Sequence, residues 1–492
     1  MERCSGILMH VSSLPAPYGI GTFGKSATDF IDFLKRTGQK CWQVLPMGPT
    51  GYGDSPYQSF STFAGNPYFI DLDMLREEGL ISQELLAALD WGDDPAKADY
   101  GKIFTGRHAV LNAAFLSRSE KDRSAAAAFA ERNHDWVYDY ALFMALKEHF
   151  GMAAWTEWPD PLIRKRDPAR MGYYWHRLKA RIDFWIHTQY LFFRQWDDLK
   201  RYANKAGIRI IGDMPIYVAM DSVDVWSHSD LFQLDDNGHP THVAGCPPDY
   251  FSENGQLWGN PLYDWDRHRE TGYGWWRQRL EAGLKMHDLL RIDHFRGFES
   301  YYRIPASHKT ARKGAWEKGP GMEFFKAMMD AAPENRIIAE DLGLMTAEVR
   351  KLLKDTGFPG MKVLQFAFDP TEPSDHLPHK YSANCVVYTG THDNTTAVGW
   401  FREAKPRERA YAQKYLALSQ EEGLHWGLIR GAFGSVADIA VIQMQDLLGL
   451  DEGSRMNRPS TLGGNWQWRM TDGQISDEMC RRLTEITALY GR

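Results

Sequence analysis

Acidic residues follow five of the apolar runs in the sequence, at the points where those runs end. They are Asp213, Asp293, Glu340 with Asp341, Asp369 and Asp393. Asp at such a point can instead cap the helix that follows a strand, and for any single residue the two interpretations carry similar weight. If the runs are parallel strands of one barrel, their carboxyl ends meet at one mouth. Carboxylates that converge there suit either a hard metal ion or glycosidic chemistry.

Arg291 and Asp293 favour one of these two chemistries. They lie two residues apart in L-R-I-D-H-F-R-G, so on a strand their side chains share one face. A guanidinium beside a carboxylate lowers the pKa of the carboxylate and keeps it ionised, as a nucleophile requires. The same guanidinium would repel a divalent cation. The sequence therefore favours glycosidic chemistry and predicts no metal site.

Two other strand exits leave alternatives open. Glu340 and Asp341 are neighbours in I-I-A-E-D-L-G and point to opposite sides of a strand, so only one can face the mouth, and the pattern does not say which. Asp393 lies between His392 and Asn394. These three side chains suit the hydroxyl groups of a sugar, and the alternative is a local turn motif.

Eight short apolar or β-branched runs, bounded by Gly and Pro, could form the strands that position these residues. Continuous apolar sequence is typical of parallel strands that are buried on both faces. Helical patterns separate many of the runs, and one of them ends before Gly38, the position of a C-terminal cap. This alternation, with a count of eight, predicts an α/β protein with a (β/α)8 TIM barrel. The runs are residues 6–14, 40–46, 208–218, 289–298, 336–342, 361–368, 384–391 and 438–446.

Two gaps between the runs are too long for ordinary connections, so the sequence predicts large, mainly helical insertions after strands 2 and 3. Residues 50–204 are rich in Ala and in apolar residues at helical spacing, which predicts an inserted helical subdomain. Residues 219–288 begin with a mixture of Gly, Pro, Asn and Trp, more typical of an irregular functional loop than of a packed layer. We expect residues 1–492 to form a single catalytic barrel that carries both insertions.

Composition narrows the class of protein. The 492 residues include 57 Lys and Arg against 64 Asp and Glu, which gives a net charge of −7 and argues against a nucleic acid partner. No apolar stretch approaches the roughly 18 residues of a membrane-spanning helix. The first residues lack the pattern of a secretory signal, and the five cysteines form no C-x-x-C motif. We expect a cytoplasmic enzyme whose oligomeric state the sequence does not predict.

Aromatic residues are abundant, with 18 Trp and 22 Tyr, many of them in stretches rich in Gly, Pro and Asn. Flat aromatic faces exposed in a cleft suit the C–H groups of sugar rings. The alternative is packing under long loops, and composition does not separate the two.

Two further motifs suggest other chemistry. Residues 19–24 read G-I-G-T-F-G, the spacing of a dinucleotide fingerprint, but L-P-A-P-Y separates them from the strand and no acid follows the second strand to hold a ribose. A nicotinamide-dependent oxidoreductase is therefore a weak alternative. His239 and His242 lie near Cys246, but no fourth zinc ligand has the usual spacing.

The motifs R-I-D-H-F-R-G, A-E-D-L-G and T-H-D-N-T-T-A-V-G-W make the sequence similar to glycoside hydrolase family 77, the amylomaltase or disproportionating-enzyme family of 4-α-glucanotransferases. The resemblance continues through G-Y-G-D-S-P-Y-Q, G-D-M-P-I-Y-V and R-P-S-T-L-G-G-N-W-Q-W-R, and it covers nearly the whole chain. The sequence departs from the family pattern only in small ways, such as at Ala347 and Cys246. The resemblance implies a barrel with insertions and no C-terminal β-domain.

Matched residue by residue, the resemblance also implies catalytic roles. Asp293 is the nucleophile that forms a covalent β-glucosyl intermediate, Glu340 is the acid and then the base, and Asp393 stabilises the distorted sugar.

The expected substrate-binding residues form a larger set. The resemblance places Arg291, His294 and His392 on the same sugar, with Tyr57 and Asp213 nearby. Asp369 is expected to bind substrate from its own strand exit.

Transfer differs from hydrolysis in the nucleophile that reaches the intermediate first, so water must be kept out of the cleft. Residues 247–265 have the composition of a flap, and the resemblance places such a loop there. We hypothesise that Tyr250, Phe251, Gln256 and Trp258 in this segment give acceptor sugars a stacking surface and exclude solvent.

The sequence thus predicts a retaining 4-α-glucanotransferase that moves α-1,4-glucan segments between maltooligosaccharides or to glucose, without a cofactor. One alternative is an α-glucan hydrolase of the same fold. Another is a non-catalytic glucan-binding protein, against which the three intact acids speak.

Overall fold

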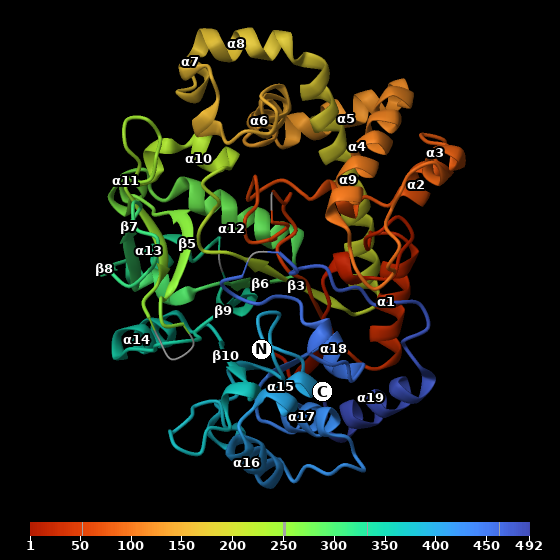
Figure 1. Cartoon of the computed structure of the whole chain (residues 1–492), viewed down its shortest axis with the longest axis vertical. Coiled ribbons are helices and arrows are strands. Elements are labelled where there is room, and N and C mark those ends of the chain that lie inside the picture. Colours follow the sequence, from red (N-terminus) through yellow and green to blue (C-terminus); the bar gives the residue numbers. More distant parts are fainter. Residues whose placement is uncertain (52, 249–251, 332, 462) are drawn as a thin grey trace.

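The apolar runs form one eight-stranded parallel sheet. The computed structural model describes every residue of the chain except 52, 249–251, 332 and 462 (Figure 1). Each predicted run overlaps one strand of this sheet. The strands are β1 Cys4–Leu8, β2 Cys41–Gln43, β3 Arg209–Met214, β6 Leu289–Ile292, β9 Ile337–Ala339, β10 Gly360–Val363, β11 Cys385–Tyr388 and β12 Ile439–Gln443.

The sheet closes into a barrel. Its strands follow the order β10-β11-β12-β1-β2-β3-β6-β9. Between the two end strands, the N–H of Ala339 in β9 donates to the carbonyl oxygen of Pro359 directly before β10, at 2.9 Å. A closed ring of eight parallel strands surrounded by helices is a (β/α)8 barrel, so the predicted fold class is confirmed.

Strand register decides which side chains line the barrel. Asp213 of β3 pairs with Arg291 of β6, and Arg291 pairs in turn with Ile338 of β9. Side chains alternate between the two faces of a strand, so Asp213, Arg291 and the residue two positions after Ile338 point to the same interior space. That residue is Glu340.

Helices cover the barrel. In α1, Lys25–Arg36, the buried face includes Phe30, Ile31 and Leu34, and the glycine at position 38 has a φ of 75°, which glycine adopts without strain. None of the helices built from the described residues is both long and apolar enough to cross a bilayer. The others are α2 Leu72–Glu77, α3 Gln83–Ala87, α4 Tyr100–Ser117, α5 Glu120–Arg132, α6 Val137–His149, α7 Pro161–Arg164, α8 Pro168–Arg177, α9 Lys179–Lys205, α10 Val223–Ser227, α11 Trp265–Glu270, α12 Gly274–Met286, α13 Gly321–Met328, α14 Ala347–Thr356, α15 Ala397–Glu403, α16 Pro406–Leu416, α17 Leu424–Phe433, α18 Met444–Leu447 and α19 Asp477–Leu489.

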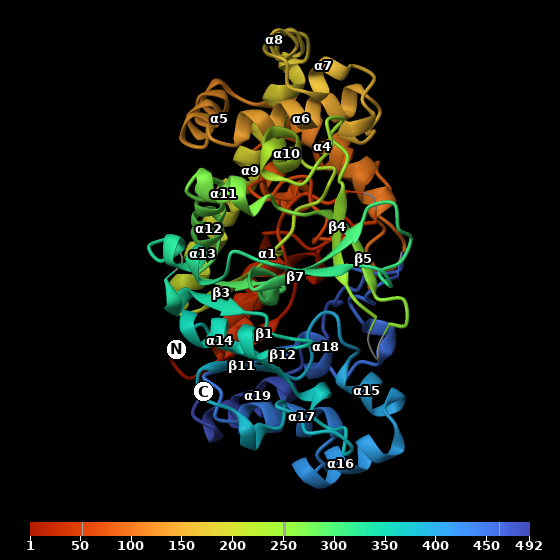
Figure 2. The same cartoon turned by 90° about the vertical axis from the view of Figure 1, so that its left-hand side faces the viewer.

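The segment between β2 and β3 is helical, and it extends beyond the barrel. Helices α5 to α8 form a layer at one end of the molecule in both views (Figures 1 and 2). A buried lysine of α6, Lys147, donates to the carboxylate of Asp221 and to the carbonyl oxygens of Met152 and Ala153. Asp221 lies in the loop after β3, so this ion pair anchors the helical layer to the mouth of the barrel.

A second, antiparallel sheet lies beside the mouth, and the sequence patterns did not predict it. Its order is β5-β4-β7-β8, and it has its own small apolar cluster around Ile304, separate from the main core. The segment after β3 supplies two of its strands, and the segment after β6 supplies the other two. They are β4 His242–Cys246, β5 Gln256–Pro261, β7 Ser300–Pro305 and β8 Ala315–Lys318.

Candidate active site

Arg291 lies between two carboxylates at the mouth of the barrel. One guanidinium nitrogen, Nη1, donates to both oxygens of Asp213 at 2.7 and 2.8 Å and to Oδ1 of Asp293 at 3.0 Å. The Nε–H of Arg291 is directed at the sulfur of Met361 in β10, at 3.3 Å. Arg291 is only 4% exposed. The buried cation of Arg291 therefore holds Asp213 and Asp293 close to each other at the mouth of the barrel.

Burial and neighbouring charges both act on the pKa values of Arg291 and Asp213. Burial alone would lower the pKa of Arg291, but Asp213 and Asp293 raise it well above its ordinary value, so the side chain stays a cation. Burial raises the pKa of Asp213, while Arg291 opposes that shift. Asp213 accepts two of the hydrogen bonds of Arg291, whereas Asp293 accepts one, on a single oxygen. The other carboxylate oxygen of Asp293 is the one that could act as a nucleophile.

Glu340 follows β9 and reaches the same space. Its Oε2 accepts the backbone N–H of His294 at 2.6 Å, and its Oε1 accepts the N–H of Leu342 at 2.9 Å. Burial raises the pKa of Glu340 to about 7; Arg291 and the two N–H donors oppose the shift, and Asp293 adds to it. A carboxyl group with this pKa can both donate and accept a proton near neutral pH.

Asp341 points the other way, as strand alternation requires. Its carboxylate accepts the N–H of Met361 at 2.6 Å, and it lies so close to Gly360 that a Cβ there would meet Oδ2 at 2.6 Å. Asp341 thus braces β10 from outside the barrel, which leaves Glu340 as the acid of this exit that faces the mouth.

Asp393 follows β11, and its carboxylate is half exposed. Its Oδ1 accepts the side-chain N–H of Asn457 at 2.6 Å and lies 3.3 Å from Nε2 of His392. The neighbouring Asn394 forms a turn instead, because its Oδ1 accepts both the N–H and the hydroxyl of Thr391, each at 2.9 Å. Asn394 therefore builds a local turn that presents His392 and Asp393, and the sugar contacts of these two residues stay a prediction.

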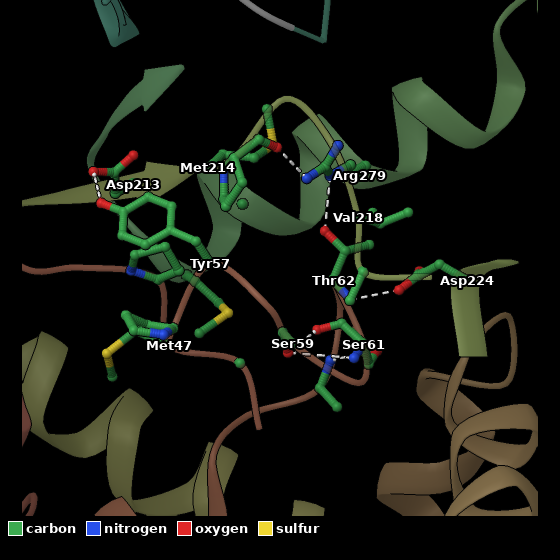
Figure 3. Close-up of a pocket in the computed structure, with 18 of the residues that line it drawn as sticks. Met47, Tyr57, Ser59, Ser61, Thr62, Asp213, Met214, Val218, Asp224 and Arg279 are labelled. Carbon is green, nitrogen blue, oxygen red and sulfur yellow. Dashed lines mark hydrogen bonds between the residues drawn. The ribbon is translucent and has the colours of Figure 1, made fainter. Parts of the chain in front are cut away.

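Aromatic rings form one wall of the site. Tyr57 stacks on His392 with ring centres 5.1 Å apart and planes 19° apart, and Trp466 lies 5.7 Å from Tyr57 and 5.9 Å from His392. The hydroxyl of Tyr57 donates to Oδ2 of Asp213 at 2.9 Å (Figure 3). Tyr57 therefore joins the wall to the carboxylate group below it.

Trp258 of β5 contributes a further aromatic ring to the site, next to His294. Its ring meets the ring of His294 edge to face at 4.9 Å and 86°, and its indole N–H donates to Oε1 of Gln256 at 3.1 Å. His294 has a φ of 48°, unusual for a residue with a side chain. Burial lowers the pKa of His294 to about 4, so its imidazole is neutral. Tyr250 and Phe251 lie outside the described residues.

Asp369 lies in a turn beyond β10. Its Oδ1 accepts the N–H of Thr371 at 2.9 Å and the hydroxyl of Thr371 at 2.5 Å, and its nearest cations are Lys405 and Arg407 beside and in α16. No contact among the described residues joins it to Arg291 or Asp293. One oxygen of this carboxylate thus builds the turn, the local role that is the alternative for any acid at a strand exit, and the predicted substrate contact of Asp369 stays a prediction.

Two residues of the wall were missed from the sequence, Asn457 and Trp466. Both come from the segment after β12, where Arg455 donates to the carbonyl oxygens of Asp393 and Asn457 and the N–H of Asn457 donates to that of His392. The signals in the sequence are the Trp- and Asn-rich stretch 457–468 in a region without periodicity and the family motif R-P-S-T-L-G-G-N-W-Q-W-R, which includes Trp466.

The two competing motifs have structural explanations. A Cβ on Gly24 would meet a carboxylate oxygen of Asp71 at 2.0 Å, so an anion of the protein already occupies the start of α1, where a dinucleotide phosphate would bind. His242 faces Arg303, whose guanidinium lies 2.8 Å from its Nε2. Among the residues that the structure describes, no group of three or more His, Cys, Asp or Glu is arranged to hold a metal ion.

Comparison with known proteins agrees with this geometry. The sequence profile of a family described as 4-alpha-glucanotransferase matches residues 9–475. The chain is 51% identical to a 4-alpha-glucanotransferase of Streptococcus pneumoniae, covering 100% of this chain and 98% of that protein. It belongs to the 4-alpha-glucanotransferase family. A family member from Thermus thermophilus is 50% identical, with 98% of each chain covered.

Solved structures of the family have the same fold. An amylomaltase from Streptococcus agalactiae, in complex with acarbose, superposes with a TM-score of 0.97 at 44% identity over 100% of both chains. The family assignment supports the transferase prediction, and it favours neither a hydrolase nor a non-catalytic binding protein.

Proposed function

We propose that the chain transfers segments of α-1,4-glucans from one maltooligosaccharide to another, or to glucose, and that it retains the configuration of the transferred bond. The observation that carries this proposal is the arrangement of Asp293, held by Arg291, beside Glu340. Such a pair of carboxyl groups, one hydrogen-bonded to a cation and one able to give up a proton, suits a two-step displacement.

In the first step, a carboxylate oxygen of Asp293 attacks the anomeric carbon of the donor sugar. Glu340 gives its proton to the departing glycosidic oxygen, so the bond breaks without releasing an alkoxide. The reducing-end fragment leaves, and the other fragment remains bound to Asp293 as an ester. The pKa of Glu340, about 7, keeps a substantial fraction of this side chain protonated at neutral pH.

In the second step, the 4-hydroxyl of an acceptor sugar enters the place of the departed fragment. The ionised Glu340 takes the proton of that hydroxyl as its oxygen attacks the anomeric carbon, and Asp293 leaves. Two inversions give net retention. Both enzyme carboxyl groups return to their starting states, so the cycle needs no cofactor.

The surrounding side chains bind the same sugar in this proposal. Asp393, with Asn457 and His392, accepts hydrogen bonds from sugar hydroxyls and stabilises the distorted ring. Arg291, His294, Tyr57 and Asp213 line its other sides, and Gln256 and Trp258 contribute the acceptor side, together with Tyr250 and Phe251. Asp369 binds the glucan from its own strand exit in this proposal.

Exclusion of water is the second requirement. Residues 247–265 form the flap in this proposal, and Trp258 reaches from it to His294. A second sugar then meets the ester before water does.

The same proposal covers the organisation and setting of the enzyme. The chain is one catalytic barrel, residues 1–492, with inserted subdomains at 50–204 and 219–288. Its partners are maltooligosaccharides, glucose and longer α-1,4-glucans, and neither nucleic acid nor membrane. The acarbose complex of the Streptococcus agalactiae relative supports a carbohydrate site. The five cysteines lie far apart in the sequence and form no C-x-x-C motif, which supports a cytoplasmic enzyme.

Incubation with maltotriose alone tests the activity. A transferase yields glucose and a ladder of longer chains with a constant number of reducing ends. Asp293→Asn should lower the rate by at least about 10⁴-fold. A steady gain in reducing ends would instead show a hydrolase. Binding without any product would show a non-catalytic protein.

A further inference from the structure

Arg279 is a buried arginine on the outer side of the barrel wall, in α12. It is 2% exposed. Its guanidinium donates to the carbonyl oxygen of Ile216 at 2.9 Å, to that of Pro215, and to the hydroxyls of Thr62 at 2.7 Å and Tyr263 at 3.1 Å. Figure 3 shows the guanidinium reaching two of these segments next to the pocket that Tyr57 and Asp213 line.

Each segment that Arg279 binds also carries a residue of the proposed site. Thr62 lies five residues after Tyr57, in the same loop. Pro215 lies two residues after Asp213, where β3 leaves the barrel. Tyr263 lies two residues after the end of β5, the strand of Trp258. Arg279 is thus one point at which three walls of the cleft meet.

Other hydrogen bonds tighten the same junction. The hydroxyl of Tyr263 donates to the carbonyl oxygen of Ile216 at 2.7 Å. The side chain of Asn260 in β5 donates to Val218 at 2.8 Å and accepts from Gln58, the neighbour of Tyr57, at 3.1 Å. The three segments therefore form one hydrogen-bonded unit, with Arg279 beneath it.

The surroundings of Arg279 favour a cation with a fixed shape. The guanidinium carbon lies 4.8 Å from the ring centre of Trp276 and 5.4 Å from that of Trp275. The buried carboxyl of Asp224 accepts the N–H of Thr62 at 2.8 Å and supplies a nearby negative charge. Four acceptors in different directions match the planar fork of arginine, whereas lysine has a single nitrogen.

We propose that Arg279 is a positioning residue of the transfer reaction: it fixes the loop of Tyr57 and the exit of β3 relative to each other, and so holds Asp213 against Arg291. Arg291 also holds Asp293, so a shift of the β3 exit reaches the nucleophile. This inference rests on the proposed roles of Tyr57, Asp213 and Asp293.

The test compares three variants at a temperature at which all remain folded. Arg279→Met removes the donors and keeps most of the volume, and Arg279→Lys keeps the charge but not the fork. Arg336→Met is the matched control. Arg336 also donates to three backbone carbonyl oxygens at the end of α12, those of Leu284, His287 and Asp288, but away from the mouth.

We expect Arg279→Met to lower kcat/KM for maltotriose transfer by about 10- to 100-fold, with a fall in kcat as well as a rise in KM. Arg279→Lys should recover less than about a third of the loss on a logarithmic scale, because a lysine cannot meet four acceptors. Arg336→Met should lower Tm by a similar amount and keep kcat and KM within about twofold.

Two results would overturn the inference. One is an Arg279→Met enzyme with kcat and KM within twofold of the parent. The other is an activity loss in Arg336→Met equal to that in Arg279→Met, which would show that lost stability alone explains both. Activity in Asp293→Asn would overturn the proposed function instead, whatever the arginine variants show.

Discussion

The carboxylate of Glu340 accepts a hydrogen bond from the backbone N–H of His294, the residue directly after Asp293, at 2.6 Å. The proposed acid is thereby fixed to the strand exit that carries the proposed nucleophile. A main-chain donor cannot rotate away as a side chain can, so the spacing between the two carboxyl groups depends on the backbones of β6 and β9.

The dependence of kcat/KM on pH should follow the ionisation of Glu340. Its pKa is raised from 4.5 to about 7, mainly by burial. The first step needs the protonated form, so kcat/KM for maltotriose should fall about tenfold per pH unit above pH 7. A maltosyl fluoride donor checks the assignment, because departing fluoride needs no proton. If the high-pH fall persists in its first-step rate, another group is responsible.

The same shift has a consequence for stability. A folded-state pKa above the unfolded value gives stability that is fully present below pH 4.5 and is lost as pH rises through 7. Glu340→Gln carries no charge to bury. Its Tm should therefore exceed that of the parent by about 1–3 °C at pH 8.5, with no gain at pH 4. Thermal melts of both proteins at the two pH values measure this difference.

The amide of Asn457 should matter for substrate binding. It donates to Oδ1 of Asp393 at 2.6 Å, so Asn457→Ala frees that carboxylate to turn and should lower kcat/KM by about tenfold. Asn465→Ala is the matched control. Among the described residues, the Asn465 amide bonds to Thr461 and Arg458 in the same segment, and the control should stay within twofold. Equal effects would point to the segment as a whole.

Tyr57→Phe separates two roles of one side chain. The variant keeps the ring that stacks on His392 and loses only the hydroxyl that donates to Asp213 at 2.9 Å. We expect a three- to tenfold fall in kcat/KM, the size of one hydrogen bond to a charged group. Tyr57→Ala loses both roles and should fall at least tenfold further. Equal effects of the two substitutions would assign the whole effect to the hydroxyl.

Trp258→Ala should change the fate of the intermediate. Removal of this ring opens the space beside His294 to water, so the ratio of hydrolysis to transfer should rise about tenfold or more. Newly formed reducing ends, measured against glucose released from maltotriose, give this ratio. Trp316→Ala, in β8 of the same small sheet, is the control. A constant ratio in Trp258→Ala would mean that this side chain does not exclude water.

The barrel was predictable because its signal is local. A parallel strand buried on both faces needs a continuous apolar run, and each such run overlaps a strand. The antiparallel sheet has no comparable signal. β4 pairs with β7, about 60 residues further along the chain, and the charged residues Glu317 and Lys318 of β8 break the apolar pattern.

The site was predictable to the extent that strand exits determine it. The positions of Asp213, Arg291 and Asp293 on their strands predict that they lie together. Strand position does not show whether a carboxylate at a strand exit already accepts a hydrogen bond from a nearby hydroxyl. The hydroxyl of Thr371 donates such a hydrogen bond to Asp369. Asn457 lies on no regular element, so no periodicity pointed to it. Its contact with Asp393 arises only when the last loop folds back over β11.

The small sheet has a practical meaning for anyone who redesigns this enzyme. Its strands come from two different exits of the barrel, and β7 begins only six residues after His294. Lengthening the β7–β8 hairpin would therefore displace the nearby residues of the catalytic centre. The layer of α5 to α8, fastened to the mouth through Lys147, offers a safer point for grafting a tag or a carrier module.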